Sequence, residues 1–379
     1  MVSISVVSQK FIKNRNVMKT LLSIIISLAC VFGLSLDSVA RNTAKTEADL
    51  KEELLQLAKK LSIPSIQVTY TSPSETISFV VVNDDFYNIQ GRHQEYQPIT
   101  TESVYQAASI SKPPMAYIAL KLAEEGKLKL DKPVYKYYRP MLDLFADKES
   151  KKKAKKITAE MIMLHLTGLD NKTYKNIEYK GTPGEKYRYS GPAIHILDLA
   201  IGHILKKDLR FYSKDYIFDK IGMDHSNYYW LDEYDRTAVA GFWMDGRYRY
   251  RKSWRGSSNA AYTLRTTSEE YTKFIRWIMN GADLSKESNE KMFKEYFQMP
   301  SGDYQGLIWR KDKHPELGTI YHHRGNNRTH QGWMGFFPET KETLCFFINS
   351  ETKTPDFISN VISAFMGNET PIISLRKKQ

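Results

Sequence analysis

The chain has 379 residues, 41% of them hydrophobic, and two cysteines, so it can bury a sizeable core without disulfide staples, as one large domain or two interleaved ones. Its formal net charge of +12 suits an anionic envelope surface or polymer. The basic runs lack any recognisable nucleic-acid-reading module, so we expect a solvated basic surface and no nucleic-acid partner.

The first forty residues have the pattern of an export signal. Basic residues precede an apolar stretch at 21–36, and small residues at 38–40 resemble a cleavage site. The apolar stretch is shorter than the roughly twenty residues of a spanning helix, so we expect no stable membrane span once residues 1–40 are removed. The sequence therefore predicts export to the periplasm or secretion. Anchoring by an uncleaved signal or a lipidated Cys30 is the less favoured alternative.

Helix and strand patterns follow the signal. Apolar residues at helical spacing predict an amphipathic helix over 47–60. Two β-branched runs, 65–71 and 77–82, are separated by turn residues and predict a hairpin. A helical pattern then covers 115–125, and Gly126 stands where a left-handed cap would end it.

The middle of the chain, from 158 to about 280, has helical patterns between turn-rich, aromatic loops. The clearest helical patterns lie at 194–205 and 267–279. The densest basic run, 151–156, precedes this region and is expected as an exposed loop. We therefore predict that this part of the chain is a mostly helical insert.

The end of the chain returns to strand patterns, at 319–323, 333–337 and 344–348, followed by a helical pattern at 356–366. Strand patterns near both ends of the chain imply one shared sheet. We find no internal repeat and no low-complexity linker that would divide the chain into independent units.

These patterns predict an α/β (α+β) fold with a mostly helical domain inserted into it. The sheet domain would comprise 41–112 and 268–379, and the helical domain with its long loops would comprise 113–267. The active site is expected between the two domains.

A serine and a lysine after the first hairpin are candidates for catalysis. The spacing Ser-x-x-Lys decides nothing alone, because five serines have it: Ser109, Ser150, Ser288, Ser350 and Ser374. Only Ser109 follows a tight apolar entry and opens a helix. Residues three apart share a helix face, so the ammonium of Lys112 can reach the Ser109 hydroxyl and activate it. The alternative is a helix start with an incidental lysine.

Three ordered motifs carry a family resemblance. Residues 106–113, Gln-Ala-Ala-Ser-Ile-Ser-Lys-Pro, resemble the first motif of penicillin-binding proteins, class C β-lactamases and their esterase and D-peptidase relatives. The setting of Tyr189 resembles the family's second motif, Tyr-x-Asn, but Gly191 replaces the asparagine that usually helps to hold the substrate's acyl-amide side chain. His323-Arg324-Gly325 is similar to the third motif, Lys-Thr-Gly or His-x-Gly, with His322 as the alternative if the strand register slips.

Further segments extend the resemblance over about 66–349. Residues 164–169, 221–223 and 260–267 are similar to other parts of the same family. The resemblance implies a β-lactamase/transpeptidase-like fold, in which an antiparallel sheet with flanking helices carries the inserted helical domain.

The resemblance also implies roles for the motif residues. Ser109 would attack a carbonyl, form an acyl-enzyme and be freed by water, with Lys112 and Tyr189 passing protons. The main-chain N–H groups of Ser109 and Asn326 would form the oxyanion hole. His323 would face Tyr189 and orient it, stabilise its phenolate, or touch a substrate carboxylate when charged.

Other positions complete the expected site. Gly191 and Gly325 are expected to contact substrate, and neither a metal nor an organic cofactor is expected. Arg324 is assigned no chemistry. Three aromatic residues are weaker candidates for lining the cleft, with buried packing as the favoured role: Trp254, Tyr262 and Trp333.

The leading hypothesis is a serine hydrolase that acts on an ester, an amide or a peptide ending in a D-amino acid. Its substrate would be a small molecule or peptide, with cell-wall fragments among the candidates. His323 and Gly191 stand where the family's motifs have a lysine and an asparagine, and both replacements argue against efficient β-lactam hydrolysis. The alternative is a non-catalytic envelope protein of the same fold that binds peptidoglycan fragments or peptides. The sequence does not indicate an oligomeric state.

Overall fold

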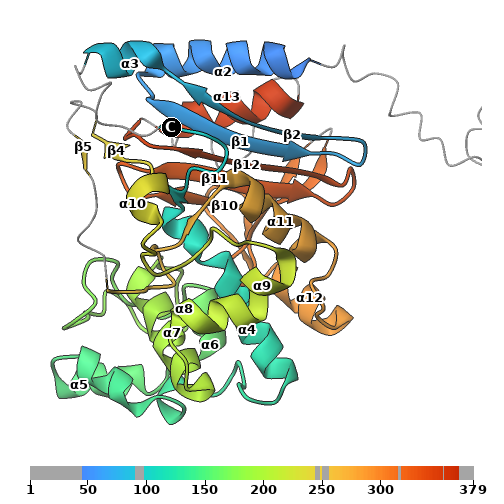
Figure 1. The fold of residues 1–379 in the computed structure, drawn as a ribbon. Coiled ribbons are helices and arrows are strands. Elements are labelled where there is room, and N and C mark those ends of the chain that lie inside the picture. The colour runs from blue at the N-terminus through green and yellow to red at the C-terminus, as the bar shows by residue number, and fades with distance from the viewer. Residues whose placement is uncertain are drawn as a thin grey trace, which may run out of the picture. The chain divides into compact units, whose positions relative to one another are not determined.

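An antiparallel sheet of eight strands, built from segments near both ends of the chain, organises the fold (Figure 1). The predicted hairpin is present as β1 (Ser65–Thr71) and β2 (Thr76–Val82). β1 also pairs with β12 (Glu342–Ile348), with Ile66 opposite Ile348. The strand order is β2-β1-β12-β11-β10-β9-β8-β7, so the predicted shared sheet is confirmed.

The remaining strands of this sheet come from the C-terminal part of the chain: β7 (Phe297–Gln298), β8 (Tyr304–Gln305), β9 (Arg310–His314), β10 (Gly318–Asn326) and β11 (Gln331–Phe337). β9 pairs with β10 only as far as His322, which lies opposite Arg310. β11 pairs with β10 up to Asn326. The last residues of β10, from His323, therefore leave one edge free for the segment that carries Ser109.

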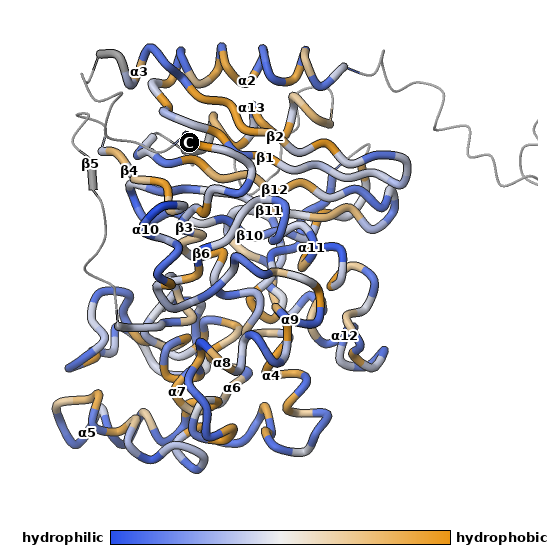
Figure 2. Tube along the Cα trace, in the orientation of Figure 1, coloured by the Kyte–Doolittle hydropathy of each residue, from blue (hydrophilic) through white to orange (hydrophobic). Residues whose placement is uncertain are grey.

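Two helices cover one face of the sheet: α2 (Glu47–Leu61) and α13 (Thr354–Met366) (Figure 1). Leu54 on α2 and Val361 on α13 belong to one buried cluster with Phe346 of the sheet. Apolar and polar positions alternate along α2 at helical spacing, as Figure 2 shows. The predicted terminal helices are thus confirmed, and hydrophobic burial holds them on the sheet.

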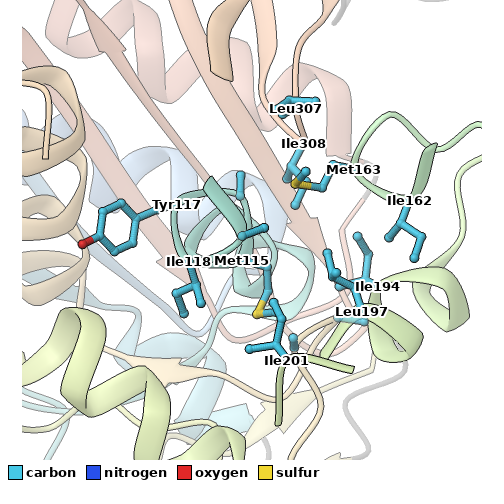
Figure 3. Close-up of a cluster of buried hydrophobic side chains, with 14 of the residues drawn as sticks. Met115, Tyr117, Ile118, Ile162, Met163, Ile194, Leu197, Ile201, Leu307 and Ile308 are labelled. Atoms are coloured by element: carbon cyan, nitrogen blue, oxygen red, sulfur yellow. The ribbon is translucent and has the colours of Figure 1, made fainter. Parts of the chain in front are cut away.

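The helical part lies against the other face of the sheet, with α11 (Ser268–Met279) next to it and α4 (Pro113–Glu124) at its centre (Figure 1). Nine of the twelve residues of α4 are buried, so this helix is surrounded on most sides. Figure 3 shows its neighbours: Ile162, Met163, Ile194, Leu197, Ile201, Leu307 and Ile308. α4 therefore gives the residues before it a rigid base.

The other elements are short except for one helix that follows Tyr189, α7 (Gly191–Leu205). The short helices are α3 (Asp84–Ile89), α5 (Lys148–Ala154), α6 (Ala159–Met163), α8 (Leu209–Ser213), α9 (Asp219–Ile221), α10 (Tyr234–Thr237), α12 (Lys286–Phe293), η2 (Ala108–Ser111), η3 (Val134–Lys136), η4 (Arg139–Leu144) and η5 (Lys214–Phe218). Two small sheets pair β3 (Tyr105–Gln106) with β6 (Arg265–Thr266) and β4 (Gly241–Phe242) with β5 (Tyr248–Arg249).

The basic run 151–156 does not form the predicted loop, because most of it belongs to helix α5. Asp147 caps this helix by accepting a hydrogen bond of 2.8 Å from the main-chain N–H of Ser150. Ala154 is the one buried residue of the helix. A single apolar contact in two turns leaves no periodic pattern, which is why the charges alone suggested a loop.

The structure, a computed structural model, describes residues 45–89, 98–243, 248–249, 256–314, 317–352 and 354–366. The predicted signal and Trp254 lie outside these residues. From Glu47 on, the chain belongs to one compact unit. The domain boundaries at 112/113 and 267/268 therefore stay predictions. Within the described ranges, no helix has the length and apolar character needed to cross a membrane.

Candidate active site

Ser109 lies in a 3₁₀ turn, η2, directly before α4, and not inside the helix itself. Its side chain is partly exposed, whereas its neighbours Ala108 and Ile110 are buried. β10 approaches this turn so closely that a Cβ added at Gly325 would lie 2.4 Å from the carbonyl oxygen of Ala107. Only glycine therefore fits at position 325, where it abuts the turn that holds the serine.

Lys112 is buried, with 2% of its surface exposed, and its Nζ points to the serine. Nζ donates hydrogen bonds to Ser109 Oγ at 3.0 Å and to the main-chain oxygen of Ala261 at 2.6 Å. Burial lowers the pKa of Lys112 to about 7, because water no longer stabilises the ammonium. Near neutral pH the lysine therefore has a large neutral fraction that can accept the serine proton.

Tyr189 stands on another side of the serine. Its hydroxyl donates a hydrogen bond of 2.7 Å to Ser109 Oγ, and Lys112 Nζ lies 4.9 Å from the centre of its ring. Burial raises the pKa of Tyr189 above its ordinary value, since a buried phenolate loses its hydration. The resting tyrosine is therefore a neutral proton donor, and the lysine is the better base in the free protein.

His323 is buried near the end of β10, and it shares a hydrogen bond of 2.8 Å between its Nδ1 and the carbonyl oxygen of Arg324. A carbonyl oxygen only accepts, so the proton lies on Nδ1 and Nε2 is free to accept. Burial first, and then the charge of Lys112, lower the pKa of His323 well below its ordinary value. A lowered pKa favours the neutral imidazole, so of the roles expected for His323 it favours orienting Tyr189 over touching a substrate carboxylate as a cation.

His322, the alternative to His323, faces the other side of the sheet. Its ring stacks on Trp333 with centroids 5.8 Å apart, in the layer beneath α2 and α13. Burial, and then the charges of Arg310 and Arg324, lower the pKa of His322 to about 3. The register thus directs His323, and not His322, toward Lys112.

Asn326 and Gly191 lie at the start of a turn and of a helix, respectively. Asn326 closes the β10–β11 turn with its side chain, which accepts from the N–H of Arg328 at 2.8 Å and donates to Gln331 at 3.2 Å. Gly191 is buried at the start of α7. The role of the Asn326 N–H in an oxyanion hole stays a prediction.

The aromatic candidates divide between the two faces of the sheet. Trp333 has no exposed surface and packs with Phe346 in the outer layer, so it does not line the site. Tyr262 is half-buried, and its ring lies 5.6 Å from that of Tyr174. Arg324 is exposed on β10. Of the aromatic candidates that the structure describes, only Tyr262 lies beside the loop of Ala261.

His165, a residue with no predicted role, binds both neighbours of Tyr189. Its carbonyl oxygen accepts from the N–H of Arg188 at 2.7 Å, and its Nδ1 accepts from the N–H of Ser190 at 3.3 Å. Its ring lies 4.4 Å from the Tyr189 ring. Burial lowers the pKa of His165 well below its ordinary value, so the ring is neutral, and the N–H of Ser190 requires Nδ1 to be the unprotonated nitrogen. The available signals were a polar residue inside an apolar segment and the similarity of residues 164–169 to a segment of the family.

Asp198 is a second residue that the sequence did not indicate. Its carboxylate accepts hydrogen bonds from the hydroxyl of Tyr212 at 2.8 Å and from the N–H of Ala260 at 3.3 Å. It therefore ties α7 to the loop whose next residue, Ala261, binds Lys112. An acidic residue inside the apolar pattern of α7 was the available signal.

This arrangement can activate a hydroxyl and relay its proton. Ser109 Oγ has a partly neutral amine on one side and a neutral phenol on the other. Within the part of the chain that the structure describes, no group of three His, Cys, Asp or Glu residues is placed to hold a metal ion. The chemistry of the cluster is that of nucleophilic attack with proton transfer.

Comparison with known proteins gives one family and one fold. A family profile described as Beta-lactamase matches residues 56–364. A β-lactamase from Pseudomonas fluorescens is 22% identical over 259 residues, which cover 66% of this chain and 70% of that protein.

Solved structures share the architecture. A penicillin-binding protein homologue from Pyrococcus abyssi has a TM-score of 0.70 at 20% identity, covering 87% of this chain and 80% of that one. A D-alanine carboxypeptidase from Burkholderia cenocepacia has a TM-score of 0.69 at 17% identity, covering 85% and 99%. A class C β-lactamase has a TM-score of 0.71 at 16% identity, covering 87% and 98%. The predicted β-lactamase/transpeptidase-like fold is confirmed.

Proposed function

The chain belongs to the beta-lactamase family, and we propose that it is a serine hydrolase that forms an acyl-enzyme on Ser109. One observation carries this proposal: Ser109 Oγ lies 3.0 Å from Lys112 Nζ and 2.7 Å from Tyr189 Oη. A serine hydroxyl is a weak nucleophile until a base removes its proton, and this geometry provides both a base and an acid.

In the acylation half, neutral Lys112 takes the proton of Ser109 while Oγ attacks the substrate carbonyl. The main-chain N–H groups of Ser109 and Asn326 would stabilise the oxyanion, each by about 3–4 kcal/mol. The neutral phenol of Tyr189 gives its proton to the leaving oxygen or nitrogen as the bond breaks. The ammonium of Lys112 then restores that proton to Tyr189, which leaves an ester on Ser109 and a neutral lysine.

In the deacylation half, water takes the place of the leaving group. Lys112 and Tyr189 accept the proton of the attacking water, and the proton returns to Ser109 Oγ when the acyl bond breaks. His323, neutral with a free Nε2, can accept a hydrogen bond on this side of the site. No step consumes a co-reactant other than water.

We propose an ester, or a peptide ending in a D-amino acid, as the substrate class, with cell-wall-derived peptides included. The neutral state of His323 and the glycine at 191 support this choice over efficient β-lactam turnover. Export through residues 1–40 would bring the enzyme to such substrates. The non-catalytic alternative has no structural observation in its favour, because a binder does not require a buried lysine with a pKa near 7.

Intact-mass spectrometry after incubation with a fluorophosphonate tests the proposal. We expect one adduct on the parent protein and none on Ser109→Ala. Ser288→Ala, which removes another serine of a Ser-x-x-Lys sequence, is the matched control and should label like the parent. Absence of an adduct on the parent, or an adduct that persists in Ser109→Ala, would refute the proposal.

A further inference from the structure

The loop between α6 and α7 lies over the start of α7. Within it, residues 170–178 form a smaller loop, whose two ends are joined by a hydrogen bond of 3.0 Å from the N–H of Asp170 to the carbonyl oxygen of Glu178. Ser190, next to Tyr189, donates to the carbonyl oxygen of Asp170 at 2.8 Å. Residues 171–173, 175 and 176 of this loop are exposed, but Tyr174 turns inward and is half-buried.

Tyr174 occupies the place where a side chain at position 191 would begin. A Cβ added at Gly191 would lie 2.6 Å from Tyr174 Oη and 3.2 Å from Asn171 Oδ1. Asn171 Oδ1 in turn accepts a hydrogen bond of 2.7 Å from the N–H of Gly191. Tyr174 in this position therefore requires glycine at 191, because no larger residue fits there.

Packing fixes the ring of Tyr174. Its centroid lies 5.6 Å from that of Tyr262 and 5.7 Å from that of His195, both in edge-to-face geometry. Burial raises the pKa of Tyr174 above its ordinary value, so its hydroxyl stays protonated and can donate a hydrogen bond. The side chain thus presents a fixed aromatic ring whose one polar atom is the hydroxyl oxygen.

Across Gly191, the Tyr174 side chain lies next to the loop whose Ala261 binds Lys112. The added Cβ at Gly191 would also lie 3.6 Å from the Cβ of Ala261, whose carbonyl oxygen binds Lys112 at 2.6 Å. Tyr189, the proposed donor to the leaving group, contacts Ser109 from another direction. If Tyr189 faces the leaving group, a side chain next to the Ala261 loop would border the acyl group, the part of the substrate that stays on Ser109.

We propose that Tyr174 determines acyl specificity: its ring closes the acyl side of the site beside Gly191, so that compact acyl groups are accepted and long ones are rejected. The proposal rests on the serine hydrolase function proposed above. It assigns esters of short carboxylic acids as the preferred ester substrates. In this proposal, the function of the loop 170–178 is to position Tyr174 beside the site.

A chain-length series tests the proposal. We expect the parent to hydrolyse p-nitrophenyl acetate with a kcat/KM about tenfold or more above that for p-nitrophenyl octanoate, because pocket size discriminates chain length on this scale. Tyr174→Ala should reduce this ratio to about one to three, since its cavity accepts the longer chain. Tyr174→Phe keeps the ring and should keep the ratio. Lys175→Ala, an exposed change in the same loop, is the matched control.

A pair of variants tests the contact itself. Gly191→Ala should change the ratio because its Cβ displaces the Tyr174 hydroxyl, and Tyr174→Phe added to it should restore the parent ratio. Equal ratios in the parent and Tyr174→Ala would overturn the proposal while Ser109 still labels. If Ser109 does not label with a fluorophosphonate, the hydrolase function itself fails, and the specificity proposal falls with it.

Discussion

The ammonium group of Lys112 donates a hydrogen bond of 2.6 Å to the main-chain oxygen of Ala261. In the described ranges, its hydrogen-bond partners are this oxygen and the hydroxyl of Ser109, and neither carries a negative charge. Burial is therefore not offset by an anion, and the pKa of Lys112 falls to about 7. The two hydrogen bonds hold the lysine side chain in place. Because neither partner is negatively charged, the lysine can be neutral near pH 7 and act as a base.

The first prediction concerns the pH dependence of acylation. Neutral Lys112 is the base, so the rate of fluorophosphonate labelling should rise about tenfold per pH unit below 7 and level off above it. Burial lowers the pKa of His323 well below its ordinary value, so we expect no separate step from that residue near pH 7. Labelling rates between pH 5 and 9 provide the measurement. Lys112→Arg stays charged and should label very slowly at every pH. A flat profile in the parent would contradict the assignment.

The second prediction concerns Tyr189→Phe, which keeps the ring and removes the hydroxyl that contacts Ser109. General acid catalysis is worth roughly 10² to 10⁴ in rate, so we expect a loss of that size with alkyl esters, whose leaving groups need a proton. The loss should be much smaller with p-nitrophenyl esters, since p-nitrophenolate leaves unprotonated. The values of kcat/KM for the two substrates provide the test. Equal losses would show that Tyr189 does not protonate the leaving group.

The third prediction concerns His165→Phe. The change leaves the buried N–H of Ser190 without its acceptor, which should lower the free energy of unfolding by about 1–3 kcal/mol. Because the His165 ring packs against that of Tyr189 and its Nδ1 holds Ser190, the variant should also lose rate with alkyl esters more than with p-nitrophenyl esters. Urea denaturation and the same two kcat/KM values measure the two effects. A loss of stability with an unchanged substrate ratio would limit His165 to packing.

The fourth prediction concerns Gly325→Ala. Its Cβ would lie 2.4 Å from the carbonyl oxygen of Ala107, so the turn that holds Ser109 must move. We expect a destabilisation of about 1–3 kcal/mol and a fall in labelling rate of about tenfold or more. Gly181→Ala is the matched control, because its Cβ would meet nothing nearer than 3.8 Å. Similar behaviour of the two variants in denaturation and labelling would contradict the steric argument.

Local patterns were sufficient for part of this fold. The period of apolar residues identified α2, and β-branched runs identified the hairpin of β1 and β2. The three-residue spacing of Ser109 and Lys112 is also local, and the structure brings their side chains together. In each case the interacting residues are close in sequence, so a pattern of a few residues contains the information.

Contacts between distant segments were beyond such patterns. Ala261 binds Lys112 across 149 residues of sequence, and His165 binds Ser190 across 25. The contact between Tyr174 and Gly191 was also beyond local patterns. The sequence showed that Gly191 departs from the family motif, but Tyr174, the side chain that excludes a larger residue there, belongs to another loop. Each of these depends on how separate elements pack, which no local propensity determines.

β1 can pair with β12 only after almost the whole chain has been synthesised. Asn349 accepts hydrogen bonds from the main-chain N–H and the hydroxyl of Ser65, across 284 residues of sequence. While the ribosome is still adding β12, the hairpin made hundreds of residues earlier has no neighbour at its inner edge. Closing so long a loop is slow, and an unpaired edge invites aggregation. We therefore expect a nascent chain that stops before Glu342 to leave the sheet incomplete, with the inner edge of β1 unpaired.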